Sequence, residues 1–176
     1  MSSTPELRFE LDPPLDGGLR EQLIQIWTDV SNAGGAVGFV PPTTIDEVRP
    51  VAEEAFRRAE SGGDNIVVAF SGAETVGFLF LVGRPGALFK HWATLKRLQV
   101  SPPLQGLGVG GALLEATHET ARRDLGLEQI LLTVRGGTGT ETFYERYGYK
   151  EVARIPGLIR VAEGDDREEI YMTRRL

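Results

Sequence analysis

The segment Gln105-Gly106-Leu107-Gly108-Val109-Gly110-Gly111 carries the most information about the fold. It follows a β-rich run and Pro102-Pro103, and it precedes an apolar pattern of helical period that reaches about Leu125. Closely spaced glycines at a strand-to-helix junction let backbone amides point outward together. The first-turn amides of a helix have no internal partners, and the peptide dipoles add about half a positive charge there. The segment therefore predicts a cradle that holds a pyrophosphate without a basic side chain.

Residues 106 to 111 also satisfy the dinucleotide-binding pattern G-x-G-x-x-G. In a dinucleotide-binding fold the first glycine directly follows its strand, and an acidic residue stands about 20 positions further on. Here residues 102–105 separate the strand from the glycines, and Leu131 to Arg135 contain no carboxylate. No Gly-Lys-Ser/Thr follows, which excludes a P-loop. A tight turn without a ligand is the structural alternative.

The flanking sequence predicts a single α/β domain over residues 1–176. Thr44-x-x-Glu47 and Thr138-x-x-Glu141 have the spacing of capping boxes, and Asp16 is placed to cap an earlier helix. Strands are expected at 7–11, 65–70, 75–82, about 90–100, 129–134, 149–154 and 168–173. Helices are expected at about 19–30, 45–59, from the glycine-rich segment to about 125, and from about 138 to 148. This order predicts a mixed, mostly antiparallel sheet of about seven strands, with about four helices on its two faces.

Composition excludes several classes of protein. The chain has 176 residues, of which 41% are apolar and 25% charged, as in a soluble globular domain. Unbroken apolar stretches such as Phe78–Val82 are far shorter than the roughly 20 residues that span a bilayer, and the amino terminus shows no signal pattern. We therefore expect a cytoplasmic protein with no membrane partner. A net charge of −6 argues against nucleic acid, and the absence of cysteine with two distant histidines argues against a metal site.

Two motifs resemble those of the GNAT acyltransferases. Gln105-x-x-Gly108-x-Gly110, preceded by Leu98-Gln99-Val100 and followed by an amphipathic helix, resembles the family's acetyl-coenzyme A motif. Residues 141–149 are similar to the family's helix and turn with the pattern F-Y-x-x-x-G-[FY]. The expected order of elements matches the GNAT fold across nearly the whole chain. Within the superfamily, residues 34–39, the central motif and Ile155-Pro156-Gly157 are similar to the tabtoxin resistance protein and related antibiotic-modifying acetyltransferases.

The resemblance implies acetyl-CoA as cosubstrate and assigns roles to particular residues. In the family, the strand before the glycine loop splays from its neighbour, and its free amides take the pantetheine arm and the thioester oxygen. Here those residues are Leu98, Gln99 and Val100, with the amide of Leu98 or Val100 as the oxyanion donor. The pyrophosphate would lie on Gln105, Gly106, Leu107, Gly108, Val109, Gly110 and Gly111.

Tyr144 maps onto the residue that faces the sulfur in many members and protonates the departing thiolate. A phenol with a pKa near 10 is a weaker acid than a thiol with a pKa near 8.5. We therefore expect a hydrogen bond that strengthens as charge develops, in place of full proton transfer. Core packing is the alternative role for Tyr144, and Phe143 and Tyr147 are expected to be core residues.

The sequence departs from the family pattern at the general base. Many members carry a glutamate on the strand that here reads Trp92 to Leu98, which contains no carboxylate. An asparagine is common seven positions before the tyrosine, where this chain has Gly137. Candidates by residue type alone are Glu74, His91, Glu141 and Glu145. A water chain, or an acceptor that binds already neutral, would serve as well.

The function expected from these features is N-acetylation of a small-molecule amine by direct transfer in a ternary complex. Its acceptor specificity is expected from residues 34–39, the first two helices and residues 155–163. The excess of acidic residues weakly favours a cationic acceptor, including an amino-acid-like antibiotic. His118 is expected to be structural, and a homodimer is an option because dimers are common in the family. The rivals are a non-catalytic acyl-CoA sensor and a protein N-terminal or lysine acetyltransferase.

Overall fold

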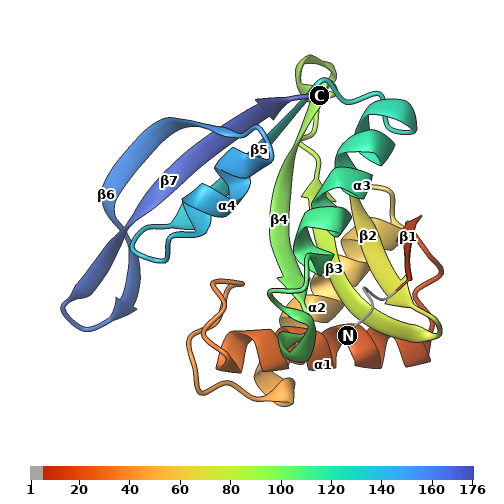
Figure 1. Ribbon diagram of the computed structural model, residues 1–176, viewed down its shortest axis with the longest axis horizontal. Helices are drawn as coiled ribbons and strands as arrows, with labels where there is room; N and C mark the ends of the chain where they lie inside the picture. Colours follow the sequence, from red (N-terminus) through yellow and green to blue (C-terminus); the bar gives the residue numbers. More distant parts are fainter. Residues whose placement is uncertain (1–5) are drawn as a thin grey trace.

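A computed structural model describes residues 6–176 of the chain. Its elements follow the order expected from the sequence, with two added 3₁₀ turns (Figure 1). In chain order they are β1 (Leu7–Leu11), α1 (Gly17–Asn32), α2 (Ile45–Glu60), β2 (Asp64–Ser71), β3 (Glu74–Val82), η1 (Ala87–Phe89), β4 (Trp92–Val100), η2 (Pro102–Leu104), α3 (Val109–Arg123), β5 (Gln129–Arg135), α4 (Thr140–Arg146), β6 (Lys150–Ala162) and β7 (Asp165–Arg175). Within residues 6–176, no helix is long and apolar enough to cross a membrane.

The strands form one sheet in the order β1-β2-β3-β4-β5-β7-β6. All neighbours are antiparallel except β4 and β5, which run parallel. The predicted mixed, mostly antiparallel α/β fold is therefore confirmed. The parallel pairing is short, because it extends only from Trp92 opposite Gln129 to Thr94 opposite Leu131. Beyond that point the two strands diverge, and the β6–β7 hairpin projects away from the rest of the sheet (Figure 1).

Helices cover both faces of the sheet, as the sequence predicts. Alternate residues of β3 point to opposite faces. Phe78 and Phe80 pack with Trp27 and the other apolar residues of α1 and α2. Leu79 and Leu81 belong to the cluster formed with α3 and α4. The sheet thus separates an α1/α2 face from an α3/α4 face.

The helix caps agree with the sequence at two of the three expected positions. The Asp16 carboxylate accepts a hydrogen bond from the Leu19 amide at 2.8 Å, and Thr44 and Glu47 form the complete capping box. The expected box at Thr138 is wrong, because the N-cap of α4 is Gly139 with φ 72° and no side-chain cap. Gly137 and Gly139 both have positive φ, and the Thr138 hydroxyl donates backward to the Arg135 carbonyl at 2.8 Å. The glycines therefore set this helix start.

The two last strands are longer than expected. They cover 150–162 and 165–175 instead of 149–154 and 168–173, and they turn through Gly164 with φ 78°. Residues 155–162, expected to help select the acceptor, are therefore part of β6. This strand is at the edge of the sheet and mostly exposed, so its sequence lacks the apolar alternation that marks a half-buried strand.

Candidate active site

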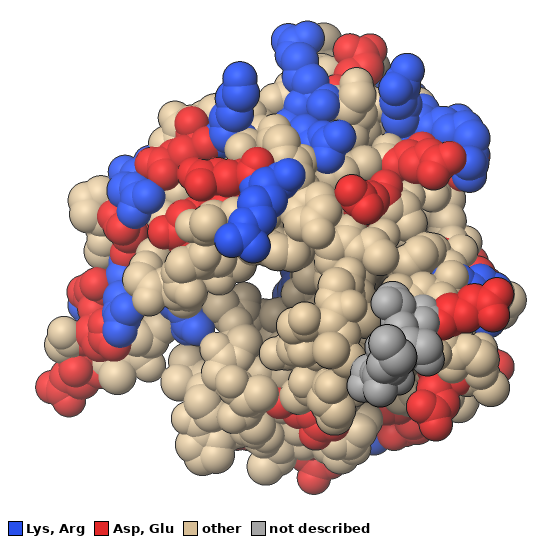
Figure 2. Space-filling view, in the orientation of Figure 1, with Lys and Arg blue, Asp and Glu red and all other residues tan. Residues whose placement is uncertain are grey.

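A cavity of about 670 Å³ opens where β4 and β5 diverge. Its walls come from β4, the glycine-rich segment, the end of β5, helix α4 and the loop after α1. Figure 2 shows an opening through the middle of the molecule, bordered by a basic side chain. The cavity thus joins the two motifs singled out in the sequence, which lie about 40 residues apart in the chain.

Strand β4 is irregular along the wall of this cavity. Its register with β3 shifts between the pairs Phe78–Gln99 and Phe80–Lys96, and Arg97 has φ 58°. Neither Arg97 nor Leu98 has a paired residue on β3 or β5. The Leu98 backbone therefore has no partner in the ladder, whereas Val100 pairs with Gly77. The Leu98 amide is for this reason the better candidate of the two for binding a ligand.

The glycine-rich segment has the geometry of an anion cradle. Gly106 and Gly108 have φ values of 77° and 85°, and a Cβ at either would meet no atom within 4 Å. Gly108 is the N-cap of α3 and supplies no side-chain cap, so the amides of residues 109–111 have no intrahelical partner. Open space next to a helix N-terminus fits a pyrophosphate group.

Two residues of the segment also have structural roles. The Gln105 side-chain amide donates a hydrogen bond to the Val100 carbonyl at 2.9 Å, which ties the segment to the end of β4. A Cβ at Gly111 would lie 1.8 Å from the Tyr147 hydroxyl oxygen, so glycine lets α3 approach α4 closely. Sequence reasoning assigned both residues to the cofactor alone.

Tyr144 lies in the wall of the cavity with only 7% of its surface exposed. Its ring packs edge-on against Phe143 and Tyr149, and no hydrogen bond of its hydroxyl is found among residues 6–176. Burial raises the pKa of Tyr144 to about 12, so the phenol is protonated at neutral pH. The gap to a thiol pKa near 8.5 is then about 3.5 units, which favours hydrogen-bond donation over full proton transfer.

The charge lining the cavity is positive, although the chain is acidic overall. The basic residues in the lining are Lys96, Arg97, Arg135 and Arg146, and no aspartate or glutamate of residues 6–176 lines it. None of the four candidate bases, Glu74, His91, Glu141 and Glu145, is among the lining residues. The weak expectation of a cationic acceptor, drawn from net charge, therefore finds no support in the cavity. The sequence analysis assigned no role to Arg97. The one feature that could have indicated a role is that it is a charged residue inside a β-rich run.

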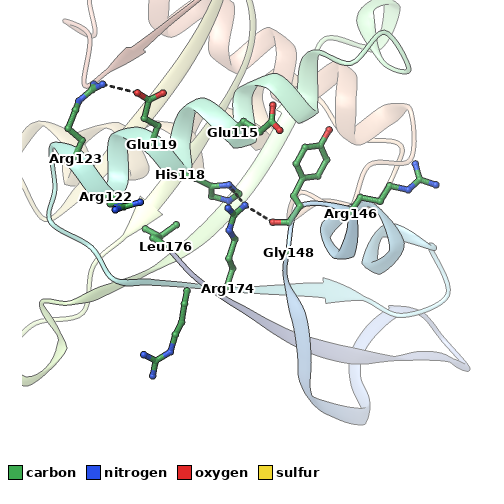
Figure 3. Close-up of a pocket in the computed structure, with 11 residues that line it drawn as sticks. Glu115, His118, Glu119, Arg122, Arg123, Arg146, Gly148, Arg174 and Leu176 are labelled. Atoms are coloured by element: carbon green, nitrogen blue, oxygen red, sulfur yellow. Dashed lines mark hydrogen bonds and ion pairs between the residues drawn. The ribbon is translucent and has the colours of Figure 1, made fainter.

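A second depression of about 1070 Å³ lies beside the outer half of α3 (Figure 3). His118 lies here and not in the cavity between β4 and β5. Arg174 donates to the His118 Nδ1 atom at 2.7 Å and to the Tyr147 carbonyl at 2.6 Å, so the protonated Nε2 donates to the Tyr149 hydroxyl at 2.9 Å. Burial, aided by the Arg174 charge, lowers the pKa of His118 to about 4. His118 thus links α3 to Tyr149 and, through Arg174, to β7.

The comparisons with known proteins agree with this geometry. Residues 62–151 match the family model of the acetyltransferase (GNAT) domain, so the chain belongs to the GNAT acetyltransferase family. No match was found among curated protein sequences.

Solved GNAT structures share the fold at low sequence identity. A GNAT-family acetyltransferase from Streptococcus pneumoniae superposes with a TM-score of 0.76 at 17% identity, covering 97% of this chain and 100% of the other. Ribosomal-protein-alanine N-acetyltransferase from Brucella melitensis gives 0.74 at 17%, covering 97% and 99%. The yncA protein from Salmonella typhimurium, solved with its cofactor acetyl-CoA, gives 0.73 at 16%, covering 99% and 95%.

Proposed function

We propose that this chain, as a single domain, is an acetyl-CoA-dependent N-acetyltransferase that transfers the acetyl group directly to the amine of a small molecule. The observation that carries the proposal is the cavity between β4 and β5, with a glycine-rich helix N-terminus and Tyr144 both in its walls. Bound acetyl-CoA would supply an acetyl group already activated as a thioester. The solved structure of yncA with acetyl-CoA supports this choice of cosubstrate.

The proposed cofactor-binding residues include those whose backbone amides have no partner in a helix or in the sheet. The amides at the start of α3, with Gly106 and Gly108 leaving space in front of them, would hold the pyrophosphate. The backbone of Leu98, Gln99 and Val100 would run beside the pantetheine arm. The Leu98 amide, which has no ladder partner, would donate to the thioester oxygen as negative charge develops on it.

Tyr144 is the proposed group that stabilises the leaving sulfur. Its hydroxyl keeps its proton at neutral pH and has no side-chain or backbone acceptor among residues 6–176, so it is available to donate to a ligand in the cavity. A hydrogen bond that strengthens while the C–S bond breaks lowers the barrier without full transfer of the proton. The amine would thus form the new C–N bond, the C–S bond would break, and the sulfur would leave as the thiolate and end as the free thiol of coenzyme A.

The proton of the attacking amine has no carboxylate to accept it in the cavity wall. An amine that binds already neutral needs no base before it attacks, and the proton that it loses as the amide forms would pass through water in the cavity to the departing thiolate. The absence of cysteine excludes an acyl-cysteine intermediate, so direct transfer in a ternary complex is the default route of the proposed mechanism. The rate is then expected to rise with pH as the fraction of neutral amine rises.

The acceptor is proposed to be a small amine in the cytoplasm. Residues 35–38 and Val30 close the cavity on the α1 side, which favours a confined ligand over a protein surface. The similarity of residues 34–39, the central motif and residues 155–157 to the tabtoxin-resistance subgroup supports an amino-acid-like acceptor, and antibiotic resistance is the corresponding biological role. Protein acetylation is the alternative, as the ribosomal-protein-alanine enzyme acts on a protein.

The proposal is tested by free-thiol release from acetyl-CoA with a panel of amines, amino acids, aminoglycosides and peptides. We expect release above the hydrolysis background with one class of small amine. Acetyl-CoA binding without release on any acceptor would support the sensor function instead. Release with peptides alone would support protein acetylation.

A further inference from the structure

Arg97 is a basic side chain of the cavity wall that has no acidic partner. Its guanidinium lies 4.6 Å from the ring centroid of Trp27, and among residues 6–176 it forms no ion pair or hydrogen bond. Asp64 is the acidic group whose charge reaches it, but Arg58 binds both Asp64 oxygens at 2.7 and 2.9 Å. A guanidinium stays charged even where burial lowers its pKa, so the cavity wall carries an uncompensated positive charge.

Gln99 is a second polar side chain of the same wall without a partner. Only 2% of its surface is exposed, and neither its amide nitrogen nor its amide oxygen has a hydrogen bond among residues 6–176. A buried amide left unpaired costs about 1–3 kcal/mol. Because Gln99 is a lining residue, a turn of its side chain toward the cavity would let the amide pair with a polar group of a ligand and offset that cost.

Both side chains lie on the α1/α2 face of the sheet. Arg97 stacks on Trp27 of α1, and Gln99 pairs with Phe78, whose ring belongs to the α1/α2 cluster. Residues paired directly across two strands share a face. Leu98 and Val100 instead pack with the cluster on the α3/α4 face, where α3 also begins. Arg97 and Gln99 therefore lie on the opposite face of the sheet from the start of α3.

We propose that Arg97 and Gln99 bind the carboxylate of the acceptor, which is therefore an amino acid or a close relative with its amine beside a carboxylate. This inference rests on the proposed function, which it makes more specific. A guanidinium donates two parallel hydrogen bonds to a carboxylate, and a neutral amide beside it adds a donor without adding charge. The absence of acidic residues from the cavity lining leaves no competing partner.

The test compares each standard L-α-amino acid with its carboxamide as acceptor at saturating acetyl-CoA, measured by thiol release. We expect the best amino acid to exceed its carboxamide by tenfold or more in kcat/KM. Arg97→Gln should raise KM for that amino acid by tenfold or more and leave the KM for acetyl-CoA and the kinetics with the carboxamide unchanged. Gln99→Leu should give a smaller rise in the same KM.

Arg84→Gln is the matched control, because Arg84 also stacks on an aromatic ring, that of Phe89 at 3.9 Å, but lies outside the cavity lining. Arg97→Gln removes no ion pair or hydrogen bond of the described residues, so its Tm should be no lower than that of Arg84→Gln. If Arg97→Gln fails to fold, Arg97→Lys keeps the charge and loses the two-point geometry, and it should show an intermediate rise in KM.

Two results would overturn the inference while the proposed function stands. The first is that the enzyme acetylates amines without a carboxylate as well as it acetylates amino acids. The second is that Arg97→Gln leaves unchanged the ratio of kcat/KM for the amino acid to kcat/KM for its carboxamide. Failure of the proposed function is seen separately, as no acetyl-CoA binding or no release with any amine. In that case Trp27 fluorescence, read in a Trp92→Phe background, reports amino-acid binding directly, and no change on titration would overturn the inference as well.

Discussion

Thr94 of β4 lies opposite Leu131 of β5, and this is the last pair of the parallel ladder. Past this pair, each strand loses the neighbour that would satisfy its backbone groups on that side. On the β4 side the register is shifted around Arg97, and on the β5 side Tyr144 of α4 belongs to the same apolar cluster as Val134. The Thr94–Leu131 pair thus marks the point where the sheet stops being a continuous layer and becomes the wall of a cavity.

Tyr144→Phe is predicted to lower kcat by about tenfold or more while the affinity for acetyl-CoA stays the same. The phenol forms no hydrogen bond among residues 6–176, so its removal should not change Tm. Tyr147→Phe, which removes a hydroxyl three residues away on the same lining, should keep kcat within about twofold. Steady-state kinetics with both variants makes the comparison, and an unchanged kcat for Tyr144→Phe would leave Tyr144 as a packing residue only.

Gly108→Glu is predicted to weaken acetyl-CoA binding by about 100-fold or more, or about 2.7 kcal/mol. The new carboxylate would occupy the open space in front of the α3 amides and repel a pyrophosphate. Gly126→Glu is the control, because Gly126 also has positive φ and open space but lies outside the cavity lining. Both variants should lose similar stability. Retained affinity in Gly108→Glu, measured by calorimetry, would place the pyrophosphate elsewhere.

Gly111→Ala is predicted to destabilise the fold by about 1–3 kcal/mol, although alanine is the better helix former. The added methyl would lie 1.8 Å from the Tyr147 hydroxyl oxygen and 2.7 Å from its ring carbon. Shortening Tyr147 to leucine in the same chain should recover part of the loss. Urea unfolding of the two single variants and the double variant measures the coupling, and additive effects would argue against this contact.

His118 is predicted to make stability depend on pH. Burial lowers the pKa of folded His118 to about 4. In the unfolded chain the same imidazole binds a proton near pH 6.5, where the imidazole of the folded chain stays neutral. Stability is therefore full above pH 6.5 and is lost as pH falls toward 4, by a total on the order of 3 kcal/mol. Urea unfolding of wild type and His118→Gln at pH 7, 6 and 5 isolates this contribution from that of the carboxylates. Parallel pH curves for the two proteins would refute it.

The parts of the site that can be predicted from the sequence are those encoded locally. The glycines of residues 106–111 and the aromatic pattern of residues 141–149 carry their meaning within one turn or one helix, so the amino-acid order alone identifies both. The spacing of Thr138 and Glu141 predicts the wrong N-cap for α4, because two glycines with positive φ start the helix at Gly139. Here the backbone conformation, which the spacing rule does not consider, sets the boundary.

The features that sequence reasoning missed depend on how distant strands align. The side to which Arg97 points is set by the register shift between β3 and β4, and no local pattern reports that shift. Net charge is a poor guide to the cavity for a similar reason, because a sum over the chain does not say which residues converge. The acidic residues lie outside the lining, and four basic residues line it.

The central claim is that this chain binds acetyl-CoA in the cavity between β4 and β5. Isothermal titration of the purified protein with acetyl-CoA tests it most directly, with free coenzyme A as competitor and NADH as the dinucleotide control. The account predicts one saturable site per chain, displaced by coenzyme A, unaffected by NADH and lost in Gly108→Glu. Absence of binding, or binding of NADH in place of acetyl-CoA, would contradict it.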